Sequence, residues 1–229
     1  MIPLSERLAL LMSFIPQNAA VCDVGTDHGY LPAALISSGR VRSVIATDIR
    51  EKPLANAAKN LERMGVSGVV LRRCDGLAAV CRDEADTVVI AGMGGEVIAG
   101  ILERAPWVKD NAVTLILQAM TSCEALRDFL ADEGFGIETE QTLSENGKVY
   151  SVIVARFDGI KRDIAPEYRY VGGIKCNTQA DREYILKQYR RVRSCAESLE
   201  GISGQEEKYL ENKAAAEAML RLMEDSDAI

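Results

Sequence analysis

The chain has 229 residues, of which 48% are hydrophobic and 27% are charged, and its formal net charge at pH 7 is -7. This length and composition are typical of a globular protein that holds one well-buried α/β domain and an additional part. No apolar run approaches the ~20 residues of a membrane span, no leader pattern opens the chain, and the negative charge disfavours indiscriminate nucleic-acid binding. We therefore expect a cytoplasmic protein without membrane contact.

Apolar, β-branched runs alternate with helical periodicities over the first 158 residues, after an amphipathic helix at 4–14. The predicted strands are 19–24, 43–48, 69–72, 86–91 and 112–118, and the predicted helices after the first are 30–38, 53–64, 97–102 and 123–133. Two closing strands, 136–142 and 148–157, flank an Asn-Gly hairpin turn. This order predicts an α/β fold, a doubly wound sheet with one antiparallel strand, which binds ligands at the carboxyl ends of its strands.

After residue 158 the pattern changes to two long amphipathic helices joined near 201–204, which predicts a helical hairpin. Residues 161–193 hold nine Lys or Arg against four acids, whereas 194–229 hold three against nine. Four tyrosines lie within the basic part, a combination that suits binding to folded RNA. The simpler interpretation of the basic residues is a solvated helix face. We expect two domains, 1–158 and 159–229.

The six cysteines form no C-x-x-C pair, and the chain contains a single histidine. A zinc site or a redox motif needs closely spaced ligands of these types. The sequence therefore predicts no metal, and the cysteines are expected to be small buried hydrophobic residues.

The turn after the first strand carries the strongest functional pattern. Asp23 ends the strand, and Gly25 and Gly29 follow as D-x-G-x-x-x-G, whereas dinucleotide folds use G-x-G-x-x-G. The pattern resembles the first motif of class I S-adenosylmethionine-dependent methyltransferases. Asp48 ends the next strand and has the carboxylate needed to accept the two hydroxyl protons of a ribose. S-adenosyl-L-methionine is therefore the expected cofactor.

Four segments carry a closer resemblance: 4–8 (LSERL), 23–32 (DVGTDHGYLP), 75–77 (DGL) and 91–95 (AGMGG). On these the chain resembles the bacterial tRNA (adenine-N1)-methyltransferases that modify adenine at tRNA position 22. The resemblance implies a class I methyltransferase domain, a helical C-terminal domain and tRNA as partner. Two positions depart from the family pattern: Gln118-Ala119-Met120 replaces Gln-Pro-Asn, and Ser151 replaces an acid after Tyr150.

The expected cofactor contacts come from the turns at the strand ends and from the first helix. They are Arg7, Asp23, Gly25, Thr26, Gly29, Tyr30, Asp48, Ile49, Asp75, Gly76, Ala91, Gly92, Met93 and Gly94. Simpler readings stay open for several: an ordinary Asp-Gly turn at 75–76, a solvated Arg7, and a Tyr30 that is either a core residue or a stacking partner of the target base.

The segment after the fourth predicted strand indicates which atom of the substrate accepts the methyl group. Amino-group methyltransferases carry a proline-aromatic clamp there, and this chain has glycines instead, which favours a ring nitrogen. Methylation of adenine N1 leaves positive charge on the base, so a carboxylate at the exocyclic amine would orient the ring and oppose that charge. Asp27 is the candidate, with helix capping as the alternative; His28 is expected either to take the departing proton or to shape the turn.

Two other functions stay open: a small-molecule methyltransferase with the same cofactor, and a non-catalytic module that binds cofactor or RNA. The replacement of Pro-Asn by Ala119-Met120 gives the second some weight. The chain is expected to be a monomer or a weak homodimer.

Overall fold

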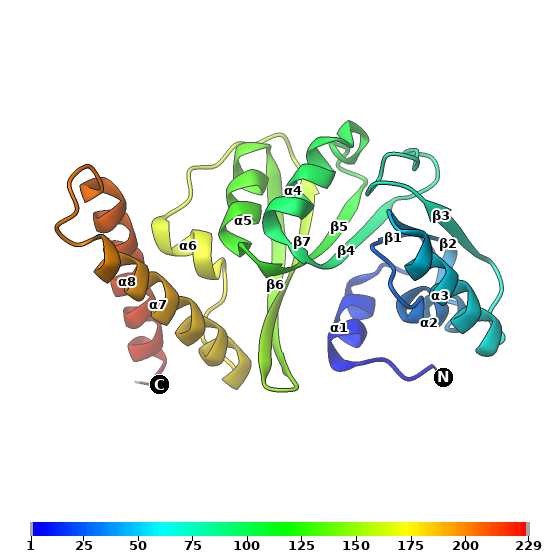
Figure 1. Cartoon of the computed structure of the whole chain (residues 1–229), viewed down its shortest axis with the longest axis horizontal. Coiled ribbons are helices and arrows are strands. Elements are labelled where there is room, and N and C mark those ends of the chain that lie inside the picture. The colour runs from blue at the N-terminus through cyan, green and yellow to red at the C-terminus, as the bar shows by residue number, and fades with distance from the viewer. Residues whose placement is uncertain (1, 228–229) are drawn as a thin grey trace.

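The computed structural model describes residues 2–227, and its centre is a seven-stranded sheet of order β3-β2-β1-β4-β5-β7-β6 (Figure 1). Strands β1 to β5 run parallel, and β7 is antiparallel to both of its neighbours. The strands are β1 Ala19–Val24, β2 Val41–Asp48, β3 Val69–Arg73, β4 Thr87–Gly94, β5 Thr114–Thr121, β6 Phe135–Glu145 and β7 Lys148–Phe157. The predicted doubly wound sheet with one antiparallel strand is confirmed.

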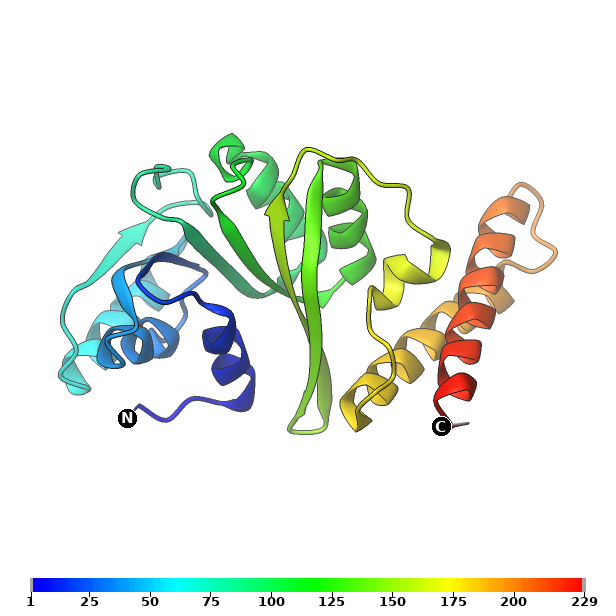
Figure 2. The same ribbon diagram turned by 180° about the vertical axis from the view of Figure 1, so that it is seen from behind.

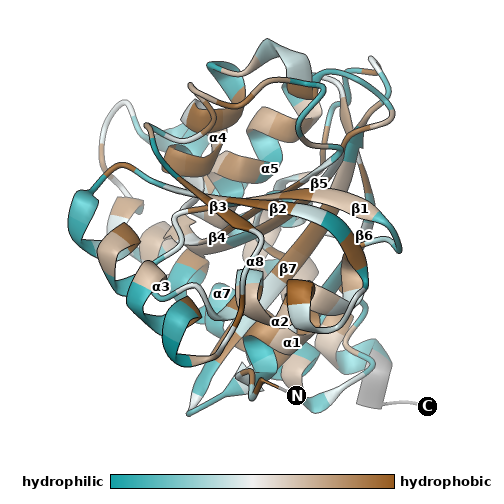
Figure 3. Cartoon of the chain, turned by 90° about the vertical axis from the view of Figure 1, so that its right-hand side faces the viewer, coloured by the Kyte–Doolittle hydropathy of each residue, from teal (hydrophilic) through white to brown (hydrophobic). Residues whose placement is uncertain are grey.

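Helices cover both faces of the sheet, α1, α2 and α3 on one face and α4 and α5 on the other (Figure 3). They are α1 Glu6–Phe14, α2 Tyr30–Ser37, α3 Glu51–Arg63, α4 Gly95–Glu103 and α5 Cys123–Asp132, with a 3₁₀ helix at Pro106–Val108. All six residues of β1 are buried, as expected for a central parallel strand whose residues other than Asp23 are apolar. The sheet therefore has one apolar core on each face.

Strand β4 is longer than predicted, because it does not end at Ala91 but continues to Gly94. The neighbouring β5 also runs past its predicted end, so that Met93 pairs with Ala119 and Gly94 with Thr121. Backbone pairing with β5 outweighs the low strand propensity of glycine here. As a result the glycine segment is held rigidly at the carboxyl edge of the sheet.

The β6–β7 hairpin is long and extends beyond the body of the sheet (Figure 2). Its turn has Asn146 at φ 52° and Gly147 at φ 71°, and these positive values are the conformation that an Asn-Gly hairpin turn requires. The predicted hairpin is confirmed, and it contacts α1 as well as the C-terminal helices.

The C-terminal part contains α6 Pro166–Val171, α7 Gln179–Leu199 and α8 Glu206–Asp227. The predicted helical hairpin is confirmed as α7 and α8, whereas the short α6 was not predicted. A capping box fixes the start of α7, in which the Thr178 hydroxyl accepts from the Asp181 amide. The three helices have an apolar cluster of their own.

Buried charge fastens this helical part to the sheet. Arg127 on α5 is fully buried, pairs with Glu140 on β6, and donates hydrogen bonds of 2.9 Å to the carbonyl oxygens of Arg169 and Tyr170. The same guanidinium donates to the Tyr184 hydroxyl on α7 at 3.1 Å. Helices α5, α6 and α7 therefore meet around one charged side chain. Within residues 2–227, no helix has the length and hydropathy to cross a bilayer.

Candidate active site

A cavity of about 330 Å³ opens at the carboxyl end of β1. Ten of the predicted site residues line it together: Arg7, Asp23, Gly25, Thr26, Asp27, His28, Gly29, Tyr30, Ala91 and Gly92. Three leucines of α1 and α2 complete the lining. Residues from α1, β1, the following turn and β4 thus converge on one hollow, at the edge where a doubly wound sheet binds its ligand.

The turn after β1 is shaped by its glycines. Gly25 has φ +82°, and its amide donates to the Thr47 carbonyl oxygen at 2.8 Å. A Cβ at Gly25 would lie 2.2 Å from the Met93 methyl carbon, so the Met93 side chain packs against the turn where any other residue would carry its Cβ. Gly29, at φ +70°, is the N-cap of α2. The turn thereby leaves its backbone accessible to a ligand beside the start of a helix.

Asp23 is the most perturbed acid of the cavity. Burial raises the pKa of its carboxyl from 3.8 to about 6, against the opposing effects of a hydrogen bond with Thr26 and the nearby Arg7 charge. A carboxylate in such a position costs folding free energy. Its presence in a cavity therefore points to a role in ligand binding.

The remaining predicted contacts lie outside the lining of this cavity, at the ends of β2, β3 and β4. Asp48 is buried and accepts from the Arg50 amide at 2.8 Å, whereas the neighbouring Ile49 is 57% exposed. The Thr47 hydroxyl donates to the Gly76 carbonyl oxygen at 3.1 Å and so ties this strand end to the next turn.

Asp75 and the glycine segment occupy the neighbouring strand ends. The Asp75 carboxylate is 3.5 Å from Arg104. Met93 and Gly94 are the last residues of β4, and the Met93 side chain reaches toward Gly25. All sixteen predicted site residues therefore lie along one edge of the sheet or, for Arg7, above it.

Asp27 and His28 stand at the rim of the cavity. Their side chains are 62% and 52% exposed, and Asp27 Oδ2 lies 3.2 Å from His28 Nε2. The N-cap of α2 is Gly29, and no side chain caps that helix, so Asp27 does not have the capping role considered as the alternative. Tyr30 is 36% exposed and its ring centroid lies 5.8 Å from that of His28, which excludes a core role for Tyr30.

The structure adds two residues that were named in the sequence only for their place in a departure. Gln118, within β5, is fully buried, and its Oε1 accepts from Arg7 Nη1 at 3.0 Å and from the Gly92 amide at 3.2 Å. The Arg7 guanidinium also lies 5.8 Å from the centroid of the Tyr150 ring. Arg7 is thus held in place, and the solvated alternative is wrong. An amide at the carboxyl end of a buried strand was the signal available in the sequence for Gln118.

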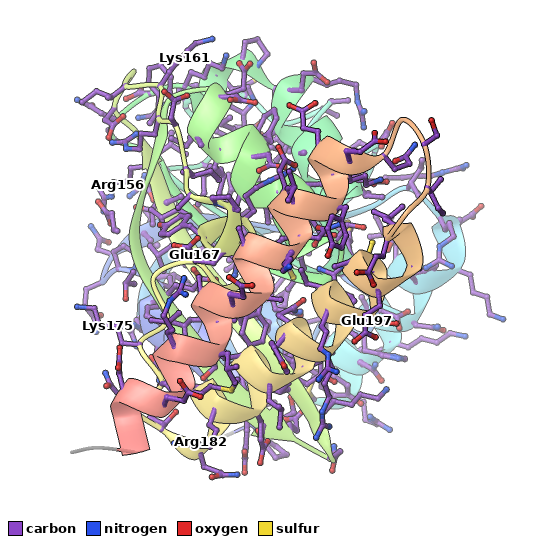
Figure 4. The ribbon with its side chains drawn as sticks, turned by 90° about the vertical axis from the view of Figure 1, so that its left-hand side faces the viewer. Arg156, Lys161, Glu167, Lys175, Arg182 and Glu197 are labelled. Carbon is purple, nitrogen blue, oxygen red and sulfur yellow. The ribbon has the colours of Figure 1, made fainter. Side chains whose placement is uncertain are left out.

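Charged side chains distinguish the surface of the C-terminal part. Figure 4 shows Arg156, Lys161 and Lys175 along one edge of this face, Arg182 near the lower end of α7, and Glu197 toward the opposite edge.

Among the described residues, no group of three or more potential metal ligands is found.

Such a sheet, with its open glycine turn and acids ending β1 and β2, defines a class I S-adenosylmethionine-dependent methyltransferase. A family model described as a methyltransferase domain matches residues 4–153. The tRNA (adenine(22)-N(1))-methyltransferase of Bacillus subtilis is 36% identical over 165 residues, which are 69% of this chain and 69% of that protein. The chain therefore belongs to the tRNA (adenine(22)-N(1))-methyltransferase family.

Solved structures agree over nearly the whole length. The crystal structure of the B. subtilis m1A22 tRNA methyltransferase has a TM-score of 0.80 and 30% identity, covering 98% of this chain and 99% of that one. A Streptococcus pneumoniae structure in complex with S-adenosyl-L-methionine has a TM-score of 0.80 and 31% identity, covering 96% of this chain and all of that one. The similarity thus includes the C-terminal helices.

Proposed function

We propose that this protein transfers a methyl group from S-adenosyl-L-methionine to N1 of the adenine at position 22 of tRNA. The observation that carries the proposal is the convergence of Asp23, Gly25, Asp27 and Arg7 on one cavity at the end of β1. The activity in the name of the B. subtilis relative supports the choice of tRNA and of the acceptor atom. A tRNA substrate also suits the cytoplasmic residence expected from the sequence.

The residues fit the cofactor. Gly25 leaves the backbone of the turn free of a side chain beside the Met93 methyl, and the buried Asp48 carboxylate suits the ribose hydroxyls. Asp23 and Arg7 supply opposite charges for the amino-acid part of the cofactor, and the turn at Asp75 and Gly76 is the one that we propose to contact its adenine ring. When bound, the cofactor supplies an electrophilic methyl group.

The chain's own contribution is to position the acceptor and to stabilise charge. The adenine N1 lone pair forms the new bond to carbon while the carbon–sulfur bond breaks, and the base gains a positive charge. The Asp27 carboxylate, exposed at the rim, accepts a hydrogen bond from the exocyclic amine and opposes that charge. His28, 3.2 Å from Asp27, is placed to take the proton that the methylated base releases.

The C-terminal part, 159–229, is proposed to bind tRNA through its basic residues. The local excess of Lys and Arg in residues 161–193, on α7 and in the segments before it, provides contacts to phosphates, which position an RNA without reading its sequence. The acidic α8 packs along α7, so its charge is directed away from the RNA-binding face in this proposal.

The test is incubation of the protein with radiolabelled S-adenosyl-L-methionine and unmodified tRNA, followed by digestion and identification of the labelled nucleoside. Labelled 1-methyladenosine is expected, and an adenine-22→guanine tRNA should accept no label. Asp27→Ala should lower kcat by about 10²–10³-fold, the range for loss of one group that stabilises transition-state charge. Asp83→Ala, an equal charge change at an exposed loop residue, is the control.

Absence of label from RNA, with cofactor binding retained, would contradict the proposal. A small-molecule methyltransferase would then be sought by offering metabolites in place of tRNA. Binding of both cofactor and tRNA without any transfer would instead indicate the non-catalytic module.

A further inference from the structure

A second and larger hollow, which we name the junction groove, lies between the sheet and the helical part. It has a volume of about 910 Å³, and its walls are the end of β5 with the start of α5, the β6–β7 hairpin, and α7. Sites for single small molecules have volumes of ~300–1,000 Å³, so the groove is at the upper limit of that range. It has room for a nucleotide and its neighbours.

Arg7 and Tyr150 form the boundary between the two hollows. Arg7 lines the cofactor cavity and Tyr150 lines the junction groove, and the guanidinium lies 5.8 Å from the ring centroid. Gln118 fixes this boundary, because its Oε1 accepts from Arg7 at 3.0 Å while its Nε2 donates to the Met120 sulfur at 3.4 Å. A planar aromatic surface is thus held beside the place where the methyl donor is proposed to lie.

Two lysines on opposite walls supply positive charge. Lys148 belongs to the hairpin and Lys187 to α7, and both are exposed. Across residues 2–227 neither forms an ion pair, whereas Arg191 in the same groove is paired with Glu124 at 2.8 and 2.9 Å. The acid Glu183 accepts from Ser144 and from Gln179. The cations left without a protein partner in the groove are therefore the two lysines, while the Glu183 carboxylate is hydrogen-bonded to neutral groups only.

We propose that the junction groove receives the target nucleotide, with the adenine stacked on Tyr150 and the flanking phosphates bound by Lys148 and Lys187. This inference rests on the proposed function. A base that undergoes chemistry must leave its stack in the RNA, and proteins hold such bases on aromatic or guanidinium planes. Met120, 42% exposed in the same groove, adds apolar surface for the base at the position where the family pattern has a polar residue.

The stacking role is tested with Tyr150→Leu and Tyr150→Phe. Because base–aromatic stacking is lost in the leucine variant, kcat/KM for tRNA should fall by about 5- to 150-fold while the Kd for S-adenosyl-L-methionine stays unchanged. The phenylalanine variant, which keeps the ring, should retain most of the wild-type kcat/KM. Tyr209→Leu, on α8 outside the groove, is the matched control.

A tRNA with 2-aminopurine at the target position gives a readout that a merely structural role would not change. Stacking on an aromatic ring quenches the fluorescence of 2-aminopurine, so the fluorescence should be low in the wild-type complex and higher in the complex with Tyr150→Leu. Equal fluorescence in the two complexes would overturn the stacking.

The phosphate role is tested with the double variant Lys148→Ala/Lys187→Ala. Loss of two phosphate contacts should reduce the slope of log K for tRNA against log salt by about 1.4 to 1.8. Lys208→Ala, an exposed lysine on α8 outside the groove, should leave the slope unchanged.

The outcomes separate this inference from the proposed function. Absence of tRNA methylation by the wild-type protein would overturn both. Wild-type methylation with normal kcat/KM in Tyr150→Leu and an unchanged salt slope in the double lysine variant would overturn the junction groove alone. If Tyr150→Leu does not fold, as judged by circular dichroism, the lysine variants and Tyr150→Phe decide the question.

Discussion

Replacing Asp23 by asparagine should stabilise the cofactor-free protein above neutral pH. The carboxyl group is buried at the end of the central strand, and burial raises its pKa from 3.8 to about 6. The folded state therefore holds the Asp23 proton more tightly than the unfolded chain does. This contribution to stability is complete below pH 3.8 and is lost as the pH rises to about 6.

The magnitude follows from the shift. One pKa unit corresponds to about 1.4 kcal/mol, so the ionised Asp23 costs about 3 kcal/mol of folding free energy above pH 7. Asparagine has nearly the same size and stays neutral at every pH. The advantage of Asp23→Asn over the wild-type protein should accordingly be close to zero near pH 4 and about 3 kcal/mol at pH 8.

The assay is urea unfolding of both proteins at pH 4, 5, 6 and 8, with Asp83→Asn as a control for loss of one exposed acid. The Asp23→Asn variant should also bind S-adenosyl-L-methionine more weakly by calorimetry, because the proposed contact with the amino-acid part of the cofactor loses its charge. An advantage that does not change between pH 4 and pH 8 would refute the reasoning, since it would mean that the Asp23 carboxylate is as well solvated in the fold as in the unfolded chain.

Three further results are expected. Gly25→Ala should weaken cofactor binding in calorimetry, because the backbone there has φ +82°, which a side chain disfavours, and the new Cβ would displace the Met93 methyl; unaltered affinity would contradict the assigned role of the turn. Arg127→Met should lower the free energy of unfolding by about 3–5 kcal/mol, because Glu140 is left buried and unpaired. The double variant Arg127→Met/Glu140→Leu should recover most of that lost stability. Equal losses in the single and double variants would refute the assigned cost of the unpaired carboxylate. Asp48→Ala should weaken cofactor binding by about 1.5–3 kcal/mol, with Asp83→Ala as control, and an unchanged Kd would exclude the ribose contact.

The sequence alone predicted features that depend on neighbours along the chain. Period-two and helical patterns report which face of a local element is buried, and they were sufficient for the strands, the helical hairpin and the Asn146-Gly147 turn. The Asp23 to Gly29 turn was recognised for the same reason, because its chemistry lies within a few residues. The strand β4 was predicted too short, since its final pairs are with β5 and have no local signal.

Only the tertiary structure could place the residues that meet across the chain. Arg7 and Gln118 are 111 residues apart in the sequence, yet Arg7 Nη1 lies 3.0 Å from Gln118 Oε1. Arg127 likewise donates a hydrogen bond to the Tyr184 hydroxyl over a separation of 57 residues. Periodicity carries no information on such pairs, because it records burial of one element and not the identity of the partner that covers it. The junction groove exists for the same physical reason: its walls are elements distant in sequence, brought together by packing of the helical hairpin on the sheet.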